Sequence, residues 1–180
     1  MRIVDACCTI NLYAAGNLLT LLPALGAEWY ITEIVVRESG FIRKADPDDP
    51  TKFVKEPIDL KPALDAAILH TCTATDDELA LFVELAALLD DGEAMCLAIA
   101  QSRGWTLATD DRKARRIARE RGVFLLSTPE LLKQWATITA AHVGDVARVL
   151  HNIQTFARFQ PNSSLPEVDW WRATVAPTTP

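Results

Sequence analysis

Four acidic residues stand where elements of secondary structure are expected to begin or end: Asp5, Glu38, Glu93 and Asp110. Asp5 follows a short apolar run at the start of the chain, and Asp110 ends the run that begins at Trp105. Open α/β sheets bind their ligands at the carboxyl ends of the strands, so we expect all four side chains to reach one common cleft. Clustered carboxylates raise one another's pKa, and Mg²⁺ or Mn²⁺ relieves this because such ions prefer oxygen ligands. The pattern therefore predicts metal-assisted hydrolysis of a phosphodiester.

The first part of the chain alternates between short apolar runs and helical patterns. Arg2–Val4 and Glu28–Ile31 are predicted strands, and Cys7–Leu22 is a predicted helix with a glycine break. Thr32 is a plausible N-cap for the next helix, which carries Glu38. Two of the elements that could position the acids are thus expected before residue 40.

Residues 43–62 differ from the segments on either side. Their prolines and acids break regular structure, so we expect an irregular insertion with one short extended piece at Phe53–Lys55. Because this insertion is longer than most loops, it is a candidate for a lid or a contact with a partner.

Helical patterns return at about residue 63. Thr75 and Glu78 fit a capping box, which opens a helix that runs to Leu89. The elements expected after it are a helix at Gly92–Ser102 closed by Gly104, a strand at Trp105–Thr109, a basic helix at Arg112–Arg121, a strand at Val123–Leu126, a helix opened by Thr128 and Pro129, and a last long helix at Thr139–Arg158. We expect the tail that carries Trp170 and Trp171 to pack back on the domain.

This alternation of short strands and helices predicts an α/β fold with a central parallel sheet flanked by helices in three layers. We place the main domain at residues 1–136, with the irregular insertion at about 43–62. Residues 137–180 are expected to be a C-terminal helix and tail that pack on the same domain.

Composition limits the classes of protein to consider. A chain of 180 residues that is 49% hydrophobic can form one packed domain, and its net charge of −6 argues against a generally basic nucleic-acid coat. The four cysteines lack the spacing of a zinc site or a disulfide framework. Reduced thiols, together with the lack of a signal-like or membrane-spanning run, favour a cytoplasmic protein.

Each acid also has a simpler structural interpretation. Asp5 could cap the first helix, and Glu93 could complete a capping box with Asp90. Either Asp110 or Asp111 could cap the basic helix, and the sequence leaves open which of the two points inward.

The basic helix begins beside the predicted acidic site. Arg112, Lys113, Arg115 and Arg116 could hold a phosphate backbone while the carboxylates hold metal. The alternative is that this run of charges is a solvated helix face.

Taken together, these motifs resemble the PIN-domain family of metal-dependent ribonucleases over roughly residues 1–126. The resemblance rests on Asp5 with Cys7 and Asn11, on Ile31 to Glu38, on Gly92 to Ala100, and on Thr109 to Arg115. Departures from the family pattern are Cys7, where Ser or Thr is common, and Glu93, where many members have Asp.

The resemblance implies an endoribonuclease with Mg²⁺ or Mn²⁺ in an acidic pocket. The residues it assigns to catalysis and metal binding are Asp5, Glu38, Glu93 and Asp110, with Asp111 as a further ligand and with Asn11 and Thr109 as supporting residues. It also implies an RNA substrate, a homodimer and, for the many members that are toxins, a small antitoxin protein. The alternatives are an inactive PIN-like module that binds protein or nucleic acid and, less favoured, a metal-dependent phosphatase.

Overall fold

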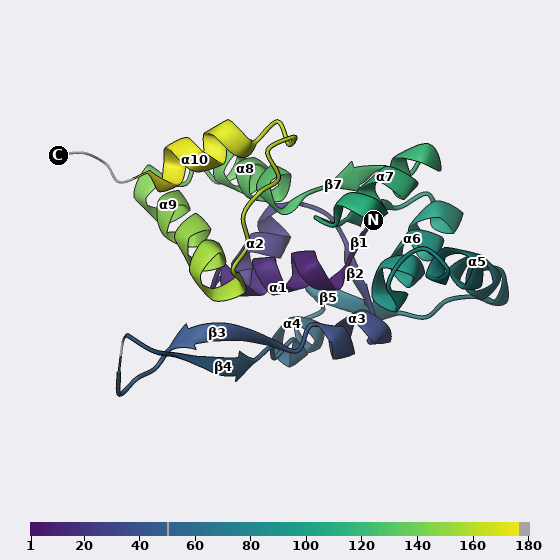
Figure 1. Cartoon of the computed structure of the whole chain (residues 1–180), viewed down its shortest axis with the longest axis horizontal. Coiled ribbons are helices and arrows are strands. Elements are labelled where there is room, and N and C mark those ends of the chain that lie inside the picture. Colours follow the sequence, from purple (N-terminus) through teal and green to yellow (C-terminus); the bar gives the residue numbers. More distant parts are fainter. Residues whose placement is uncertain (50, 177–180) are drawn as a thin grey trace.

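The core of the fold is a parallel five-stranded sheet in a computed structural model that describes residues 1–49 and 51–176. The strands follow the order β5-β2-β1-β6-β7 (Figure 1). Their bounds are β1 (Arg2–Val4), β2 (Trp29–Thr32), β5 (Leu69–Cys72), β6 (Thr106–Ala108) and β7 (Leu125–Leu126). Each neighbouring pair is parallel, which confirms the predicted fold class.

The strand order reverses beside β1. From β1 the chain builds the sheet outward through β2 to β5, and it then crosses over to add β6 and β7 on the other side. Such a switch point opens a crevice at the carboxyl ends of the strands. Asp5 follows β1 and Asp110 lies two residues beyond β6, so the topology brings both to this crevice.

The helices cover the sheet and its ends. Their bounds are α1 (Ala6–Ala14), α2 (Leu18–Ala24), α3 (Glu33–Glu38), α4 (Lys61–Asp65), α5 (Asp76–Ala86), α6 (Asp91–Arg103), α7 (Arg112–Glu120), α8 (Thr128–Ile138), α9 (Val143–Asn152) and α10 (Val168–Val175). Figure 1 shows α5 and α6 at one end of the molecule and α8, α9 and α10 at the other.

Local signals account for several of these helix ends. Thr75 and Glu78 form the predicted capping box of α5, and Thr32 caps α3 by accepting a hydrogen bond from the backbone N–H of Val35. Gly104 ends α6 with a φ of 65°, a left-handed conformation that glycine adopts without a Cβ clash.

Helix α6 is the central helix of the core. Its residues from Ala94 to Ala100 are buried, and it contacts β1, β2 and β6. A helix that is apolar on nearly every side can be stable only when its neighbours cover it. This burial fixes the start of α6, where Glu93 lies.

The segment expected to be an irregular insertion forms an antiparallel hairpin of β3 (Phe41–Ala45) and β4 (Phe53–Pro57). The expected irregular structure was wrong because it was inferred from prolines such as Pro47, which precedes the turn, and Pro57, which ends β4. The extended piece expected at Phe53–Lys55 is confirmed as part of β4. Strand β5 was also missed, because its four residues begin shortly after α4 and were assigned to a longer helical pattern.

The C-terminal part agrees with expectation at α8, which begins with Thr128 and Pro129 and has Ser127 as its N-cap. It differs from expectation beyond α8. The long helix predicted at Thr139–Arg158 is replaced by α9 and a π-helix, η1 (Ile153–Ala157), which contacts α1 and β3. Trp171 of α10 is fully buried and packs edge-on against Phe159.

All four cysteines are free thiols. Within the described residues, no single helix is both long and apolar enough to cross a membrane. Helices α1 and α2 meet that test only as a pair, with a bend of 113° between them.

Candidate active site

Three of the predicted acids line one cavity, which we call the acidic cavity. Asp5 comes from the start of α1, Glu38 from the end of α3 and Glu93 from the first turn of α6. The cavity has a volume of about 780 Å³, and its other walls include Asp90 and Asp91. The structure thus brings together carboxylates that lie far apart in the sequence, at the edge of the sheet where ligands are expected.

Asp5 is buried and serves as the N-cap of α1. Its Oδ1 accepts a hydrogen bond of 2.8 Å from the backbone N–H of Cys8, and the thiol of Cys7 donates to both carboxylate oxygens at 3.0 and 3.1 Å. Burial raises the pKa of Asp5 to about 6, although hydrogen bonds from Thr109, Cys7 and Cys8 oppose this shift. Asp5 therefore combines the capping role with a side chain that reaches the acidic cavity.

Glu93 carries the more strongly raised pKa, at about 7. Burial is the main cause, followed by the charges of Asp111, Asp5 and Asp90. Asp90 is the N-cap residue of α6, but its side chain makes no capping hydrogen bond. The complete capping box that was the structural alternative for Glu93 is therefore not formed.

Glu38 is held against the start of α6. Its Oε1 accepts a hydrogen bond of 3.2 Å from the backbone N–H of Gly92. A Cβ atom at residue 92 would lie 1.9 Å from Oε2 of the same carboxylate, so this position has room for glycine alone unless Glu38 moves. Burial raises the pKa of Glu38, and the charges of Asp91 and Asp90 add to the effect.

Asp110 lines a separate cavity of about 290 Å³, together with Asp111. Its Oδ1 accepts a hydrogen bond of 2.9 Å from the backbone N–H of Thr128. Its Oδ2 accepts from the hydroxyl of Thr128, the amide of Asn11 and the thiol of Cys8. Burial raises its pKa, and its carboxylate joins the end of β6 to the start of α8. The structure places Asp110 in the wall of this second cavity rather than of the acidic cavity, although its charge still raises the pKa of Asp5.

The neighbouring Asp111 has the opposite arrangement. Its Oδ1 caps α7 by accepting hydrogen bonds from the backbone N–H groups of Lys113 and Ala114 at 2.7 and 2.8 Å. Among the nearby charges, that of Asp111 contributes most to the raised pKa of Glu93. The charges of both aspartates therefore act on the acidic cavity, that of Asp111 on Glu93 and that of Asp110 on Asp5.

The supporting residues form a buried polar layer beneath the acids. Asn11 donates to Asp110, and the hydroxyl of Thr109 accepts a hydrogen bond from the backbone N–H of Asp111 at 3.2 Å. Sequence reasoning did not identify Thr128, which binds Asp110, or the spatial role of Gly92. The position of Thr128 two residues after β7 was a signal, because the end of a parallel strand lies at the ligand-binding edge.

The basic helix α7 is only partly available to a ligand. Arg115 is 7% exposed, and its guanidinium donates hydrogen bonds to the carbonyl oxygens of Thr109 and Leu126 at 2.8 and 2.9 Å. The predicted RNA contact by Arg115 is therefore wrong, because this side chain holds β6 and β7 to α7. Arg116 pairs with Glu120 at 3.0 Å on the surface.

The donor set of the acidic cavity suits a hard divalent cation. Among the described residues, no Lys or Arg forms an ion pair with Asp5, Glu38 or Glu93, and the pKa of each is raised. Cys7 and Cys8 lie close to Asp5, but their pKa values are also raised, to about 11 for Cys7. Thiols that stay protonated are poor ligands, so the carboxylate oxygens fit Mg²⁺ or Mn²⁺ better than the sulfurs fit a softer metal.

Comparison with known proteins agrees with this geometry. A family model described as a PIN domain matches residues 1–159, and PIN domains are generally nucleases that use divalent metals. No curated protein and no solved structure shows a significant match to the chain. The match covers most of the chain, including the sheet and every acid of the candidate site, and the chain therefore belongs to the PIN-domain family.

Proposed function

We propose that this protein is a metal-dependent endoribonuclease that hydrolyses RNA phosphodiester bonds. The observation that carries the proposal is the convergence of Asp5, Glu38 and Glu93 on one cavity without a cationic partner. Three carboxylates that share a site are stable as anions only when a cation compensates them. An ion held there would face solvent through the cavity and could meet a phosphate.

In this proposal Asp5, Glu38 and Glu93 hold Mg²⁺ or Mn²⁺, and Asp111 adds negative charge from the neighbouring strand end. A bound ion of this kind lowers the pKa of water and offsets charge on a phosphate. The thiol of Cys7 orients Asp5, and the N–H of Gly92 orients Glu38. We assign Asp110 a positioning role, because it lies outside the wall of the acidic cavity and its oxygens accept four hydrogen bonds from other elements.

Several expectations drawn from the resemblance stay predictions. They are the choice of RNA over DNA, the homodimer, the small antitoxin and the cytoplasmic location. An inactive PIN-like module that only binds a partner is the alternative that the test must separate from a nuclease.

The test is cleavage of a mixed RNA pool with Mn²⁺ or Mg²⁺, compared with EDTA, for wild type and for Asp5→Asn and Glu93→Gln. Asp77→Asn is the matched control, since Asp77 is an exposed acid in the first turn of α5. We expect cleavage by wild type and by the control, and loss of cleavage in EDTA and in both site variants. If folded wild-type protein cuts no RNA with either metal, the nuclease proposal is wrong and the inactive binding module is favoured.

A further inference from the structure

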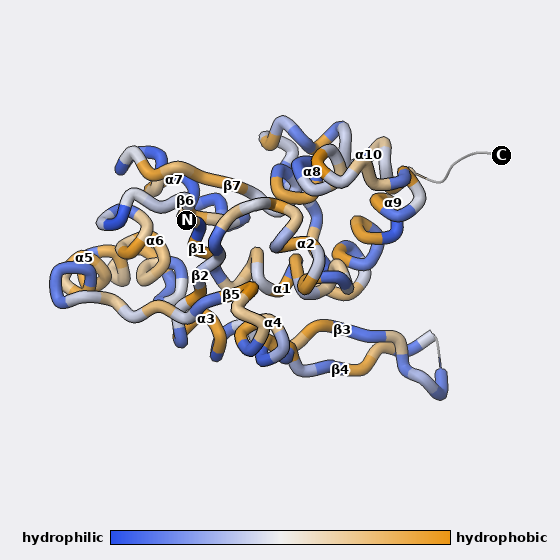
Figure 2. Tube along the Cα trace, turned by 180° about the vertical axis from the view of Figure 1, so that it is seen from behind, coloured by the Kyte–Doolittle hydropathy of each residue, from blue (hydrophilic) through white to orange (hydrophobic). Residues whose placement is uncertain are grey.

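The β3–β4 hairpin forms one wall of a second groove, which we call the hairpin groove. Its volume is about 490 Å³. The lining residues of the hairpin are Phe41, Arg43, Phe53, Val54 and Lys55, and those outside it are Ile10, Phe156, Ala157 and Arg158. Figure 2 shows hydrophobic and hydrophilic residues together along the hairpin.

The register of the hairpin places cations and aromatic rings on one face. Arg43 lies directly opposite Lys55, and Phe53 lies opposite Ala45. Because side chains alternate along a strand, Phe41, Arg43, Phe53 and Lys55 share this face. No acid of β3 or β4 lies on it.

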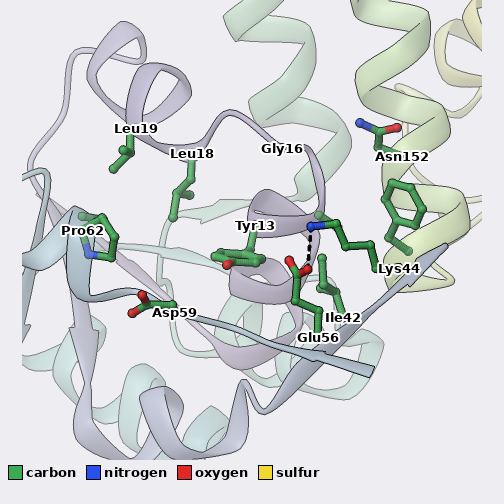
Figure 3. A pocket seen from close by; sticks show the side chains of 13 residues that line it. Tyr13, Gly16, Leu18, Leu19, Ile42, Lys44, Glu56, Asp59, Pro62 and Asn152 are labelled. Carbon is green, nitrogen blue, oxygen red and sulfur yellow. Dashed lines mark ion pairs between the residues drawn. The ribbon is translucent and has the colours of Figure 1, made fainter. Parts of the chain in front are cut away.

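On the other face of the hairpin, the positive charge is already neutralised by an ion pair. Figure 3 shows Lys44 and Glu56 pointing toward one another beside Tyr13 of α1, and their ion pair measures 2.6 Å. Ile42 of the same face is buried. This face lines a separate, mainly apolar cavity of about 400 Å³, so the hairpin docks on the domain through it.

Like charges directly opposite one another destabilise an antiparallel pair. Arg43 and Lys55 are such a pair, and neither forms an ion pair with a described residue. Instead, Arg43 lies 4.2 Å from the centroid of the Phe53 ring and Lys55 lies 4.0 Å from that of Phe41. The rings themselves are 43% exposed for Phe41 and 41% exposed for Phe53. This face therefore offers positive charge and accessible aromatic surface together.

The hairpin groove adjoins the acidic cavity. Ile10 of α1 lines both, and it lies little more than one helical turn from Asp5. On the far side, Arg158 is exposed and ends η1. A chain bound along the hairpin groove would thus run from the cations to the carboxylates.

From this arrangement we propose that the hairpin groove binds single-stranded RNA and leads it into the acidic cavity. Arg43, Lys55 and Arg158 contact phosphates, while Phe41 and Phe53 stack on unpaired bases, a combination typical of single-strand binding. The inference rests on the proposed function and names the form of its substrate. It adds the hairpin as an RNA-binding surface to α7, where Arg115 is buried and Arg116 is paired but Arg112 and Lys113 are exposed.

The test is fluorescence anisotropy of a labelled single-stranded RNA and a duplex of the same sequence, in EDTA so that nothing is cut. One variant, Arg43→Gln with Lys55→Gln, removes the two cations of the exposed face. A second, Phe41→Leu with Phe53→Leu, removes the rings. The matched control, Lys44→Gln with Lys52→Gln, removes two cations of the same hairpin that already pair with Glu56 and Asp49.

We expect wild type to bind the single strand more tightly than the duplex. Each phosphate contact on a single strand contributes about 0.7 to the slope of log K against log salt, so the cation variant should lower that slope by roughly 1.4. The ring variant should weaken binding about tenfold or more while leaving the slope unchanged, because stacking contributes about 1–3 kcal/mol per base. The control should match wild type in its salt slope and, within about twofold, in its affinity.

Unchanged binding by the cation and ring variants would overturn the inference, as would equal affinity for duplex and single strand. Failure of wild type to bind RNA in EDTA, with binding of an acidic protein partner instead, would also overturn it. These results are independent of cleavage. If wild type and the hairpin variants cut RNA with equal kcat/KM, the proposed RNA binding by the hairpin groove is wrong and the nuclease assignment stands.

Discussion

The backbone N–H of Gly92 donates a hydrogen bond of 3.2 Å to Oε1 of Glu38, across a separation of 54 residues. The same contact leaves no room for a side chain at residue 92, since a Cβ atom would lie 1.9 Å from Glu38 Oε2. The start of α6 therefore holds one acid of the candidate site by a hydrogen bond and by shape. Glu93, the next residue, contributes a second acid to the same cavity.

Gly92→Ala should impair the candidate site while leaving the stability of the fold nearly unchanged. Gly92 lies in the first turn of α6, where alanine is favoured over glycine by roughly 0.5–1 kcal/mol. The new Cβ atom would displace only the carboxylate end of the flexible Glu38 side chain. We therefore expect the free energy of unfolding, measured with urea, to change by no more than about 1 kcal/mol. Metal affinity and RNA cleavage should fall at least tenfold because Glu38 is displaced.

Gly144→Ala in α9 is the control for this substitution, because Figure 1 shows α9 at the end of the molecule away from α3 and α6. Full cleavage by Gly92→Ala would show that Glu38 does not need its observed position.

The metal-free protein should become less stable as pH rises from about 4 to about 7. Asp5 and Glu93 have folded-state pKa values of about 6 and about 7, above their ordinary values of 3.8 and 4.5. In this window the folded state binds more protons than the unfolded state, so stability falls as pH increases. The raised pKa of Asp5 alone should lower the free energy of unfolding by about 2–3 kcal/mol across this pH range.

Urea unfolding in EDTA at pH 5 and pH 8 measures this effect. Asp5→Asn should flatten the dependence, and Mg²⁺ or Mn²⁺ should restore stability at pH 8 because ligands that bind only the folded state stabilise it. A wild-type stability that increases over this range would contradict the raised pKa values.

Asp110→Asn should act mainly on stability. An amide in place of the carboxylate presents an NH₂ group to donors from Thr128, Asn11 and Cys8. Breaking buried hydrogen bonds of this kind costs about 1–3 kcal/mol, which a urea titration would detect. Asp111→Asn should cost less, because asparagine is itself a good N-cap. An Asp110→Asn protein as stable as wild type but unable to bind metal would instead identify Asp110 as a ligand.

Glu78 and Arg103 should give the protein an acid-sensitive contact remote from the site. The guanidinium of Arg103 donates to both carboxylate oxygens of Glu78 at 2.7 and 2.8 Å, and this holds the pKa of Glu78 below its ordinary value of 4.5. A lowered pKa stabilises the fold above pH 4.5, and this contribution is lost as pH falls through the folded-state pKa.

Glu78→Gln should therefore reduce stability by about 1–3 kcal/mol at pH 7 and by much less at pH 3. Thermal unfolding of wild type and variant at the two pH values tests this. An equal loss of stability at both pH values would mean that packing, rather than charge, holds Glu78.

Local sequence determined the parts of this protein that depend on nearby residues. The parallel α/β class follows from alternating short apolar runs and helical patterns. The capping box of Thr75 and Glu78, the cap by Thr32 and the glycine stop at Gly104 involve residues at most a few positions apart. Asp5 and Glu93 could be proposed because each sits at the end or start of an element with a clear pattern.

Tertiary structure decided what depends on residues distant in the chain. The sequence could not show that Asp110 is held by Thr128 and Asn11 while Asp111 caps α7, because Thr128 and Asn11 lie 18 and 99 residues from Asp110. Arg115 was predicted to face RNA because charge alone does not show that its donors meet the carbonyl oxygens of two strand ends. The hairpin groove likewise depends on pairing between β3 and β4. Helix caps and strand propensities depend on neighbouring residues, so the sequence shows them. The direction of a buried side chain depends on the hydrogen-bond donors and acceptors that folding brings next to it from distant parts of the chain.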